Sequence, residues 1–329
     1  MSNGNLSRRA VMSALSAAML GSSTAFAQQG YPNRQVRMIM PWPAGGGGDI
    51  QTRLITQRLA ENIGQPVVVE NRAGANGIIG TKAAIAAAPD GYTLVFAVNG
   101  TLTLGPALYK DVGVNAETDL MPVSGLSAQR IFLAVPTNSP LRTIRDLVDA
   151  GKASDKVSYG SSGNGALSHI CGAQLANITG AKFTHVPYKS ASHAVQAMLA
   201  GDLQFAFLIG GDLATQVKAG RLRALAVTGE PRAALMPDVP TMKEAGVSGW
   251  LPDMVWFAVF APAATPPALV DIMHRQIARV LGEPAIKERL NTQFLADPWP
   301  IGSKELGNIV RSEKANFQAA ITAARITVD

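Results

Sequence analysis

Residues 36–50 read VRMIMPWPAGGGGDI and contain a pattern that recurs later in the chain. We predict an apolar strand from Val36 to Met40, a loop with two prolines and four glycines, and a helix that opens at Asp49. Glycine reaches backbone dihedral angles that cost other residues energy, and it leaves the space before the helix free of side chains. Because the first N–H groups of a helix lack partners within the helix and carry partial positive charge, this loop is a candidate site for a carboxylate. Asp49 either only caps the helix or also holds the loop or a water molecule.

The composition is that of a globular protein. With 329 residues, of which 47% are hydrophobic and 16% charged, the chain can form two domains with sizeable cores. The single cysteine, Cys171, excludes an intramolecular disulfide and is expected in the core. The formal net charge of +6 suits an anionic ligand. No run of Lys and Arg is interleaved with aromatic residues, so no nucleic-acid partner is expected.

The N-terminus has the features of an export signal. Arg8-Arg9 precedes an apolar run from Ala10 to Leu20, and small residues then lead to Ala25-Phe26-Ala27. This order predicts a signal peptide over residues 1–27, cleaved after about Ala27, and a periplasmic location. The arginine pair favours the twin-arginine route over the general secretory route, although Val11 stands where that signal usually has Phe. A membrane anchor is the alternative, but the run is shorter than the roughly 20 residues that span a bilayer.

Strand and helix patterns alternate along the mature chain. After residue 63, strands are expected at 66–70, 92–98, 131–135, 157–160, 183–188, 203–208, 223–228 and 255–261. Helices are expected between them, including a short one at 241–245, and at 268–281, 285–291 and 303–324. This alternation predicts an α/β fold with mainly parallel sheets, whose ligands bind beyond the carboxyl ends of the strands. Loops of small or polar residues follow three predicted strands, at Asn99–Thr101, Ser161–Gly165 and Ile209–Asp212.

Other chemistries have weaker support. The glycines of Gly74–Gly80 lack the Gly-x-Gly-x-x-Gly spacing, and residues 45–48 do not continue into Gly-Lys-Ser/Thr, so a nucleotide-binding enzyme is disfavoured. No His or Cys has metal-ligand spacing, so no metal site is expected. A Ser–His–acid hydrolase would use Ser161, Ser162 or Ser168, but the sequence lacks the Gly-x-Ser-x-Gly elbow.

Three further side chains each have two interpretations. Trp42 either covers a hydrophobic contact with the other domain or forms a wall of the ligand pocket, where it would stack on an aromatic acid. The same alternatives apply to Tyr188 and to Trp256, for which a core position is favoured. His169 is either a core residue or a lining residue of the site.

Several ordered motifs of the chain resemble those of one family. They are YP at 31–32, PWPAGGGGD at 41–49, QPVVVENR at 65–72, APDGYTL at 88–94, YGSSGNG at 159–165, HVPYK at 185–189, ALAVT at 224–228 and PDVPT at 237–241. Together they are similar to the tripartite tricarboxylate transporter receptors (TctC or Bug proteins), which are periplasmic solute-binding proteins. The resemblance extends from about Tyr31 to near the C-terminus.

The resemblance implies two α/β lobes that close on a ligand like a Venus flytrap. We expect lobe 1 at residues 28–127 plus 255–329 and lobe 2 at 128–254, with hinges near Ser127 and Met254. The family delivers its ligand to a permease with large and small integral membrane subunits, without catalysis or a cofactor. We therefore expect a small organic carboxylate ligand and a monomeric receptor.

The resemblance also implies that the first glycine loop and the Ser161–Gly165 loop grip a carboxylate, mostly through backbone N–H groups and water. The candidate ligand-binding residues are Trp42, Gly45, Gly46, Gly47, Gly48, Asp49, Asn99, Thr101, Ser161, Ser162, Asn164, Gly165, His169, Tyr188, Gly210 and Gly211.

Two departures from the family pattern bear on the ligand. Trp42 stands where the family usually has Phe or Tyr, and Phe207–Gly211 reads FLIGG where it usually reads Phe-Asp-Asn-Leu/Met-Pro. Loss of the acid and amide disfavours an amine-bearing ligand such as an acidic amino acid. We expect a dicarboxylate with a bulky or aromatic body, such as a terephthalate-like compound, among the di-, tri- and aromatic carboxylates that the family binds.

Two other functions remain open at this point. An extracytoplasmic sensor would bind the same ligand and dock on a kinase of a two-component system. A small-ester hydrolase would lose turnover when Ser162 is substituted.

Overall fold

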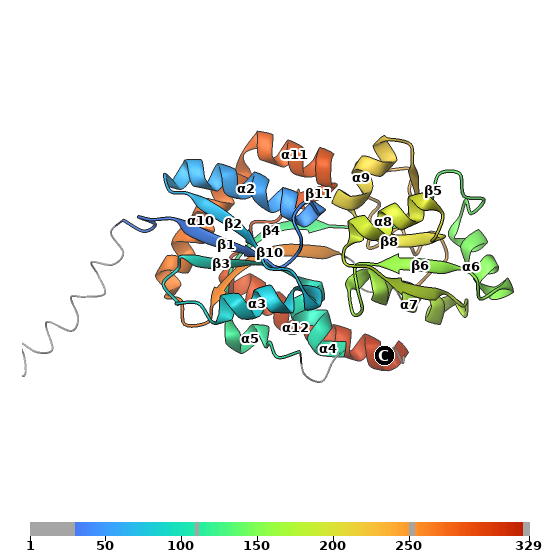
Figure 1. Ribbon diagram of the computed structural model, residues 1–329, viewed down its shortest axis with the longest axis horizontal. Helices are drawn as coiled ribbons and strands as arrows, with labels where there is room; N and C mark the ends of the chain where they lie inside the picture. The colour runs from blue at the N-terminus through green and yellow to red at the C-terminus, as the bar shows by residue number, and fades with distance from the viewer. Residues whose placement is uncertain (1–29, 109–111, 250–253, 325–329) are drawn as a thin grey trace, which may run out of the picture.

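The computed structural model describes residues 30–108, 112–249 and 254–324, so the predicted signal peptide lies outside the described residues. The chain forms two β-sheets, each flanked by helices and set end to end (Figure 1). The expected α/β fold with two sheets and flanking helices is confirmed. Within the described ranges, no helix combines the length and the apolar character that crossing a membrane requires.

The first sheet has the strand order β11-β4-β10-β3-β1-β2. Its strands are β1 (Val36–Met40), β2 (Val67–Asn71), β3 (Thr93–Val98), β4 (Leu120–Gln129), β10 (Val255–Pro262) and β11 (Ala296–Pro298). The helices and helical turns around it are α2 (Gly47–Ile63), η1 (Ala75–Gly77), α3 (Ile78–Ile85), η2 (Gly100–Leu104), α4 (Gly105–Leu108), α5 (Ala116–Asp119), α10 (Pro267–Gly282), α11 (Pro284–Phe294) and α12 (Ser303–Ala324).

The second sheet has the strand order β7-β6-β8-β5-β9. Its strands are β5 (Ile131–Pro136), β6 (Ser158–Ser161), β7 (Thr184–Pro187), β8 (Phe205–Ile209) and β9 (Leu222–Val227). Its helices are α6 (Ile144–Ala153), α7 (Leu167–Thr179), α8 (Ala191–Ala200) and α9 (Gly210–Lys218).

Alternating side chains of each strand supply two cores, one on each face of the sheet. In β1, Val36, Met38 and Met40 belong to the same core as apolar residues of α2 and α10. Ile39, which lies between them, belongs to the core that contains apolar residues of α12. The second sheet is likewise covered on both faces, with α8 and α9 on one core and α6 and α7 on the other. Burial on both faces explains why the strands read as continuous apolar runs.

The strands are more mixed in direction than the sequence predicts. In the first sheet β1 pairs in parallel with β2 and β3, whereas β10 pairs antiparallel with β3 and β4. In the second sheet β6 pairs in parallel with β7 and β8, whereas β5 pairs antiparallel with β8 and β9. The reversed strands β5 and β10 follow the two passages of the chain between the sheets: β5 begins at Ile131 after β4 ends at Gln129, and β10 begins at Val255 after the chain leaves the second sheet.

Three local expectations also need correction. The long strand β4 was not predicted, because Pro122 and Gly125 lie within it and its pairing with β10 shifts register twice. Of the loop expected at Asn99–Thr101, Gly100 and Thr101 instead belong to the π-helical turn η2, and Asn99 is its N-cap. Residues 241–245 form turns rather than a helix, and Thr241 makes an isolated bridge to Val227.

Candidate functional site

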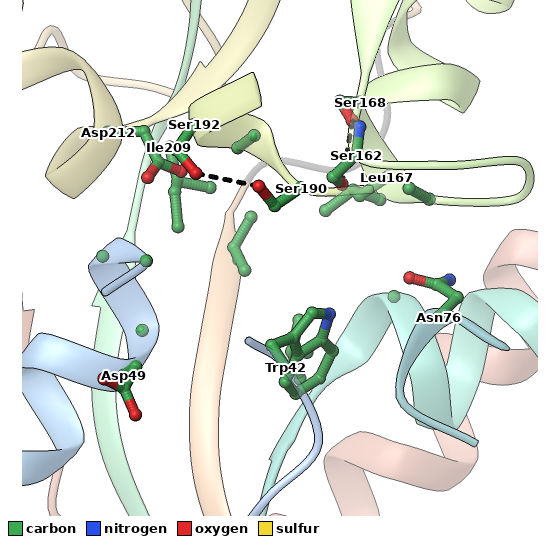
Figure 2. A pocket seen from close by; sticks show the side chains of 18 of the residues that line it. Trp42, Asp49, Asn76, Ser162, Leu167, Ser168, Ser190, Ser192, Ile209 and Asp212 are labelled. Atoms are coloured by element: carbon green, nitrogen blue, oxygen red, sulfur yellow. Dashed lines mark hydrogen bonds between the residues drawn. The ribbon is translucent and has the colours of Figure 1, made fainter. Parts of the chain in front are cut away.

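A cavity of about 190 Å³ lies between the two sheets, at the ends of their helices (Figure 2). Most of its surface is apolar, from residues such as Met40, Trp42, Phe96, Ile131, Phe207 and Phe257. Its polar lining includes Asp49, Asn76, Ser162, Ser168, Ser190, Ser192, His193 and Asp212. Among the lining residues that the structure describes there is no Lys or Arg. The described residues also contain no cluster of three His, Cys, Asp or Glu side chains placed to hold a metal.

The first glycine loop is held by Asp49. The Asp49 carboxylate is 3% exposed. It accepts hydrogen bonds from the Gly45 backbone N–H at 3.0 Å, Arg53 Nε at 3.0 Å and Asn71 Nδ2 at 2.9 Å. Burial alone would raise the pKa of Asp49, but these hydrogen bonds outweigh it and lower the pKa below its usual value. Asn71 Nδ2 also donates to the Trp42 carbonyl at 2.9 Å, so one polar cluster fixes both ends of the loop.

The start of α2 is left open toward the cavity. Its N-cap is Gly46, which has no side chain to cap the helix, and Gly46, Gly47 and Gly48 all line the cavity. Asp49 therefore does not act as the N-cap; it holds the loop from behind, and Figure 2 shows it pointing away from the cavity.

The Ser161–Gly165 loop repeats the arrangement in the second sheet. It connects β6 to α7, whose N-cap Ala166 also lacks a side-chain hydrogen bond. Ser162 lines the cavity, and its backbone N–H donates to Ser168 Oγ at 3.1 Å. The N–H groups of the first turn of α7 have no partners within the helix, so this end of the cavity can bind an anion.

Two stacked histidines support this loop from behind. The rings of His169 and His185 lie 3.8 Å apart with an interplanar angle of 8°. The Gly165 backbone N–H donates to His169 Nδ1 at 3.1 Å, and His185 Nε2 lies 2.6 Å from Ser161 Oγ. Burial lowers the pKa of His169, and burial together with His169 lowers the pKa of His185 to about 4. Both rings are therefore neutral near neutral pH, which the contact of Gly165 with His169 requires.

Trp42 lines the cavity and packs on an aromatic residue of the first sheet, the sheet that its own loop follows. Its ring meets Phe96 edge-on at a centroid distance of 5.7 Å, and Phe96 in turn meets Phe257 at 4.8 Å. In the cavity, Figure 2 shows Trp42 at the centre of the lower wall. Its side chain remains partly exposed. An aromatic surface of this kind suits a flat apolar ligand.

The structure brings seven of the sixteen predicted residues to the cavity. These are Trp42, Gly46, Gly47, Gly48, Asp49, Thr101 and Ser162. The other nine do not line it: Gly45, Asn99, Ser161, Asn164, Gly165, His169, Tyr188, Gly210 and Gly211. Several of the nine have other contacts that explain their positions.

Asn99 lies beneath the cavity, where it is fully buried. Its Nδ2 donates to the Met254 carbonyl at 3.0 Å and to Glu313 Oε1 at 3.2 Å. Gly210 and Gly211, expected in a loop, instead begin α9 directly after β8. A Cβ atom on Gly210 would collide with the Phe294 carbonyl, and one on Gly211 would lie 3.1 Å from the Phe294 ring, so these glycines allow α9 to approach α11.

Six cavity residues with polar side chains were not among the predicted ligand-binding residues; one of them is Ser168, in the first turn of α7. Asn76 is in the left-handed region at φ 49°, and its Nδ2 lies 3.4 Å from the Gly165 carbonyl, across the cavity. Ser190, Ser192 and His193 lie at the start of α8, and Asp212 lies in the first turn of α9. The sequence did contain a signal for the residues of α8 and α9, since both segments follow a predicted strand and open a predicted helix, as the first two loops do.

The chain is similar to one family of receptors over most of its length. The sequence model of the family described as "Tripartite tricarboxylate transporter family receptor" matches residues 51–326. A UPF0065 protein of Bordetella bronchiseptica is 36% identical over 276 residues, which cover 84% of this chain and 82% of that protein. A solved structure titled as a periplasmic transporter is 32% identical, with a TM-score of 0.86 over 91% of this chain and 100% of the other. Rpa4515 of R. palustris with adipate is 29% identical, with a TM-score of 0.85 over 90% of this chain and 99% of the other.

Proposed function

Because the chain belongs to the family of tripartite tricarboxylate transporter receptors, we propose that it is a periplasmic receptor for a small carboxylate. It captures the ligand between its lobes and delivers it to the membrane subunits of a permease. The observation that carries this proposal is the cavity itself. It combines an apolar lining with the start of α7, whose N-cap makes no side-chain hydrogen bond, and with the glycine loop at the start of α2.

The ligand carboxylate is held at the Ser161–Gly165 side of the cavity and faces the first glycine loop. Ser162 and the first turn of α7 supply hydroxyl and N–H donors there, and hydrogen bonds to a carboxylate are stronger than neutral ones. The helix dipole of α7 adds a favourable term for negative charge. A carboxylate can thus be bound without an Arg or Lys at the site.

The body of the ligand is bulky and largely apolar. A cavity of about 150 Å³ suffices for benzene. The volume of about 190 Å³ therefore accommodates a ring with a carboxylate. Candidates are di- and tricarboxylates and aromatic carboxylates such as terephthalate. The adipate in the related R. palustris structure is a carboxylate of this size class.

We further propose the division into lobe 1 (28–127 plus 255–329) and lobe 2 (128–254), with hinges near Ser127 and Met254. The receptor acts as a monomer, and a signal peptide over residues 1–27 takes it to the periplasm. No cofactor, metal or nucleic acid takes part.

The geometry disfavours a hydrolase. Of the three candidate serines, Ser161 contacts a histidine, but it is 1% exposed, does not line the cavity and also donates to the Gly163 carbonyl at 3.0 Å. Ser162, which does line the cavity, contacts Ser168 rather than a histidine. Neither Ser161 nor Ser162 is therefore both activated and accessible to a substrate. Ser190 lines the cavity 2.7 Å from His193 Nδ1, but it serves as the N-cap of α8, and among the described residues no carboxylate hydrogen-bonds to His193 to complete a triad.

Thermal unfolding of the mature protein, from Gln28 onward, tests the proposal against a panel of aliphatic, tricarboxylic and aromatic acids. An acid at 100 times its dissociation constant adds about 2.7 kcal/mol to the free energy of unfolding. A raised melting temperature with a carboxylate, reduced in Ser162→Ala but not in the surface control Ser312→Ala, supports the site. No shift with any acid, even after unfolding and refolding to remove a co-purified ligand, refutes it.

Two additional measurements separate the alternative functions. A receptor of a permease supports uptake of the bound acid in cells that carry the permease subunits. A sensor changes the phosphorylation of a membrane kinase instead, and a hydrolase shows turnover of small esters that is lost in Ser162→Ala.

A further inference from the structure

Asp212 lies against the start of α2 in the wall of the cavity. It belongs to the first turn of α9, and Figure 2 shows it on the upper wall beside Ser192. A Cβ atom built on Gly47 would lie 3.2 Å from Asp212 Oδ1, and the Gly47 backbone N–H hydrogen-bonds to this carboxylate. A carboxylate of the protein itself thus occupies one of the two open helix starts.

The two ends of the cavity therefore differ in charge. At one end, Ser162, Ser168 and the start of α7 offer donors and no acid. At the other end, the Asp212 carboxylate lines the cavity. Asp49 also lines it, but its carboxylate is turned toward Gly45, Arg53 and Asn71. No cationic Lys or Arg among the described lining residues offsets the charge of Asp212.

We propose that Asp212 restricts the receptor to ligands with a single carboxylate, held at the Ser162 end, whose opposite end carries no negative charge. This inference rests on the proposed function and narrows its ligand class. It replaces the expected dicarboxylate by a monocarboxylate, while the bulky or aromatic body is retained. The end near Asp212 accepts an apolar group or a hydrogen-bond donor.

The physical reason is repulsion between like charges in a partly desolvated space. Burial raises the pKa of Asp212 to about 6, so its carboxylate is ionised above about pH 7. A second carboxylate that reached this end would then lie near a like charge with no Lys or Arg between them. Two unit charges about 4 Å apart repel by several kcal/mol at the effective dielectric of a protein surface. Even after relaxation and screening, a dicarboxylate is expected to bind at least about tenfold more weakly than its uncharged isostere.

The test uses a ligand pair of nearly the same shape. 4-Methylbenzoate is terephthalate with one carboxylate replaced by a methyl group. Hexanoate is related to adipate in the same way and forms an aliphatic pair with it. Titration calorimetry measures both dissociation constants of each pair, in a buffer well above the pKa of Asp212. The readout is the ratio of the two constants, so a general change in affinity does not affect it.

Asp212→Asn is the principal variant, because the amide retains the shape and can still accept from Gly47. Asp212→Ser is the second variant, should the first fail to fold. Asp202→Asn, an exposed residue of lobe 2 outside the cavity, is the matched control. In the wild type and the control, the monocarboxylate is expected to bind at least about tenfold more tightly, and in the Asp212 variants the ratio is expected to fall by about tenfold.

Two results would overturn the proposal while the receptor function stands. One is a wild type that binds terephthalate or adipate as tightly as its monocarboxylate partner. The other is a ratio that stays the same in both Asp212 variants. If no acid binds to the wild type or to any variant, the proposed function fails as well.

Discussion

Replacement of Asp49 by alanine distinguishes two roles of this residue. If Asp49 only stabilised the start of α2, its loss would cost about 1 kcal/mol, as for a helix cap. The structure indicates a larger contribution to the free energy of unfolding, because the buried Asp49 carboxylate accepts hydrogen bonds from Gly45, Arg53 and Asn71 at 2.9–3.0 Å. A hydrogen bond to a charged group contributes about 1.5–3 kcal/mol. Arg53 is 46% exposed, so its ion pair adds no more than about 1 kcal/mol.

We therefore expect Asp49→Ala to lower the free energy of unfolding by about 3 kcal/mol. Urea unfolding followed by tryptophan fluorescence measures the change from the midpoint and slope of the transition. Asp149→Ala is the control, since this exposed acid makes only a 3.8 Å ion pair with Arg145 and is expected to cost less than about 0.5 kcal/mol. A loss of about 1 kcal/mol or less in Asp49→Ala would show that the loop does not depend on the carboxylate.

Three further predictions follow from the site. Gly47→Val places side-chain atoms against Asp212, since its Cβ would lie 3.2 Å from Asp212 Oδ1. We expect ligand binding to be abolished while the circular dichroism spectrum is unchanged. Retained affinity in titration calorimetry would contradict the assignment of the glycine loop to the site. Trp42→Ala removes an aromatic wall worth about 1 kcal/mol, so aromatic acids are expected to lose roughly fivefold in affinity and aliphatic acids much less. Equal losses in the two classes would argue against stacking. The pKa of His185 is lowered from 6.5 to about 4, so the stability contributed by its neutral ring is complete above pH 6.5 and is lost as the pH falls toward 4. After allowance for the partial exposure of the ring, we expect the free energy of unfolding to fall by about 1–2 kcal/mol over this range, as measured by thermal unfolding. An identical pH profile in His185→Asn would contradict this prediction.

Much of the local structure follows from short sequence patterns. The strand at Val36–Met40 and the helix at Ser303–Ala324 have the bounds that the sequence predicts, because apolar periodicity and glycine or proline boundaries are local signals. The helix α2 ends at Gly64, whose φ of 68° is in the left-handed region that a glycine cap supplies. Local patterns also identified two of the loops that open onto the cavity, at residues 45–48 and 161–165.

Contacts between distant segments were not predictable in this way. Asp212 and Gly47 are brought together only by the arrangement of the two sheets, and no pattern around either residue indicates the other. Asn99 illustrates the converse: it follows a strand, as a ligand residue would, but its amide donates a hydrogen bond to the partly buried Glu313 carboxylate of α12. The antiparallel strands β4, β5 and β10 likewise depend on how the chain passes between the sheets, which strand–helix alternation does not specify.

The crystal structure of the protein with the acid that stabilises it most tests the central claim most directly. We expect the ligand in the cavity between the sheets, with its carboxylate within hydrogen-bond distance of Ser162 and the first N–H groups of α7, and its apolar body against Trp42. A ligand bound elsewhere, with the cavity empty, or a carboxylate turned toward the opposite end of the cavity would contradict the account.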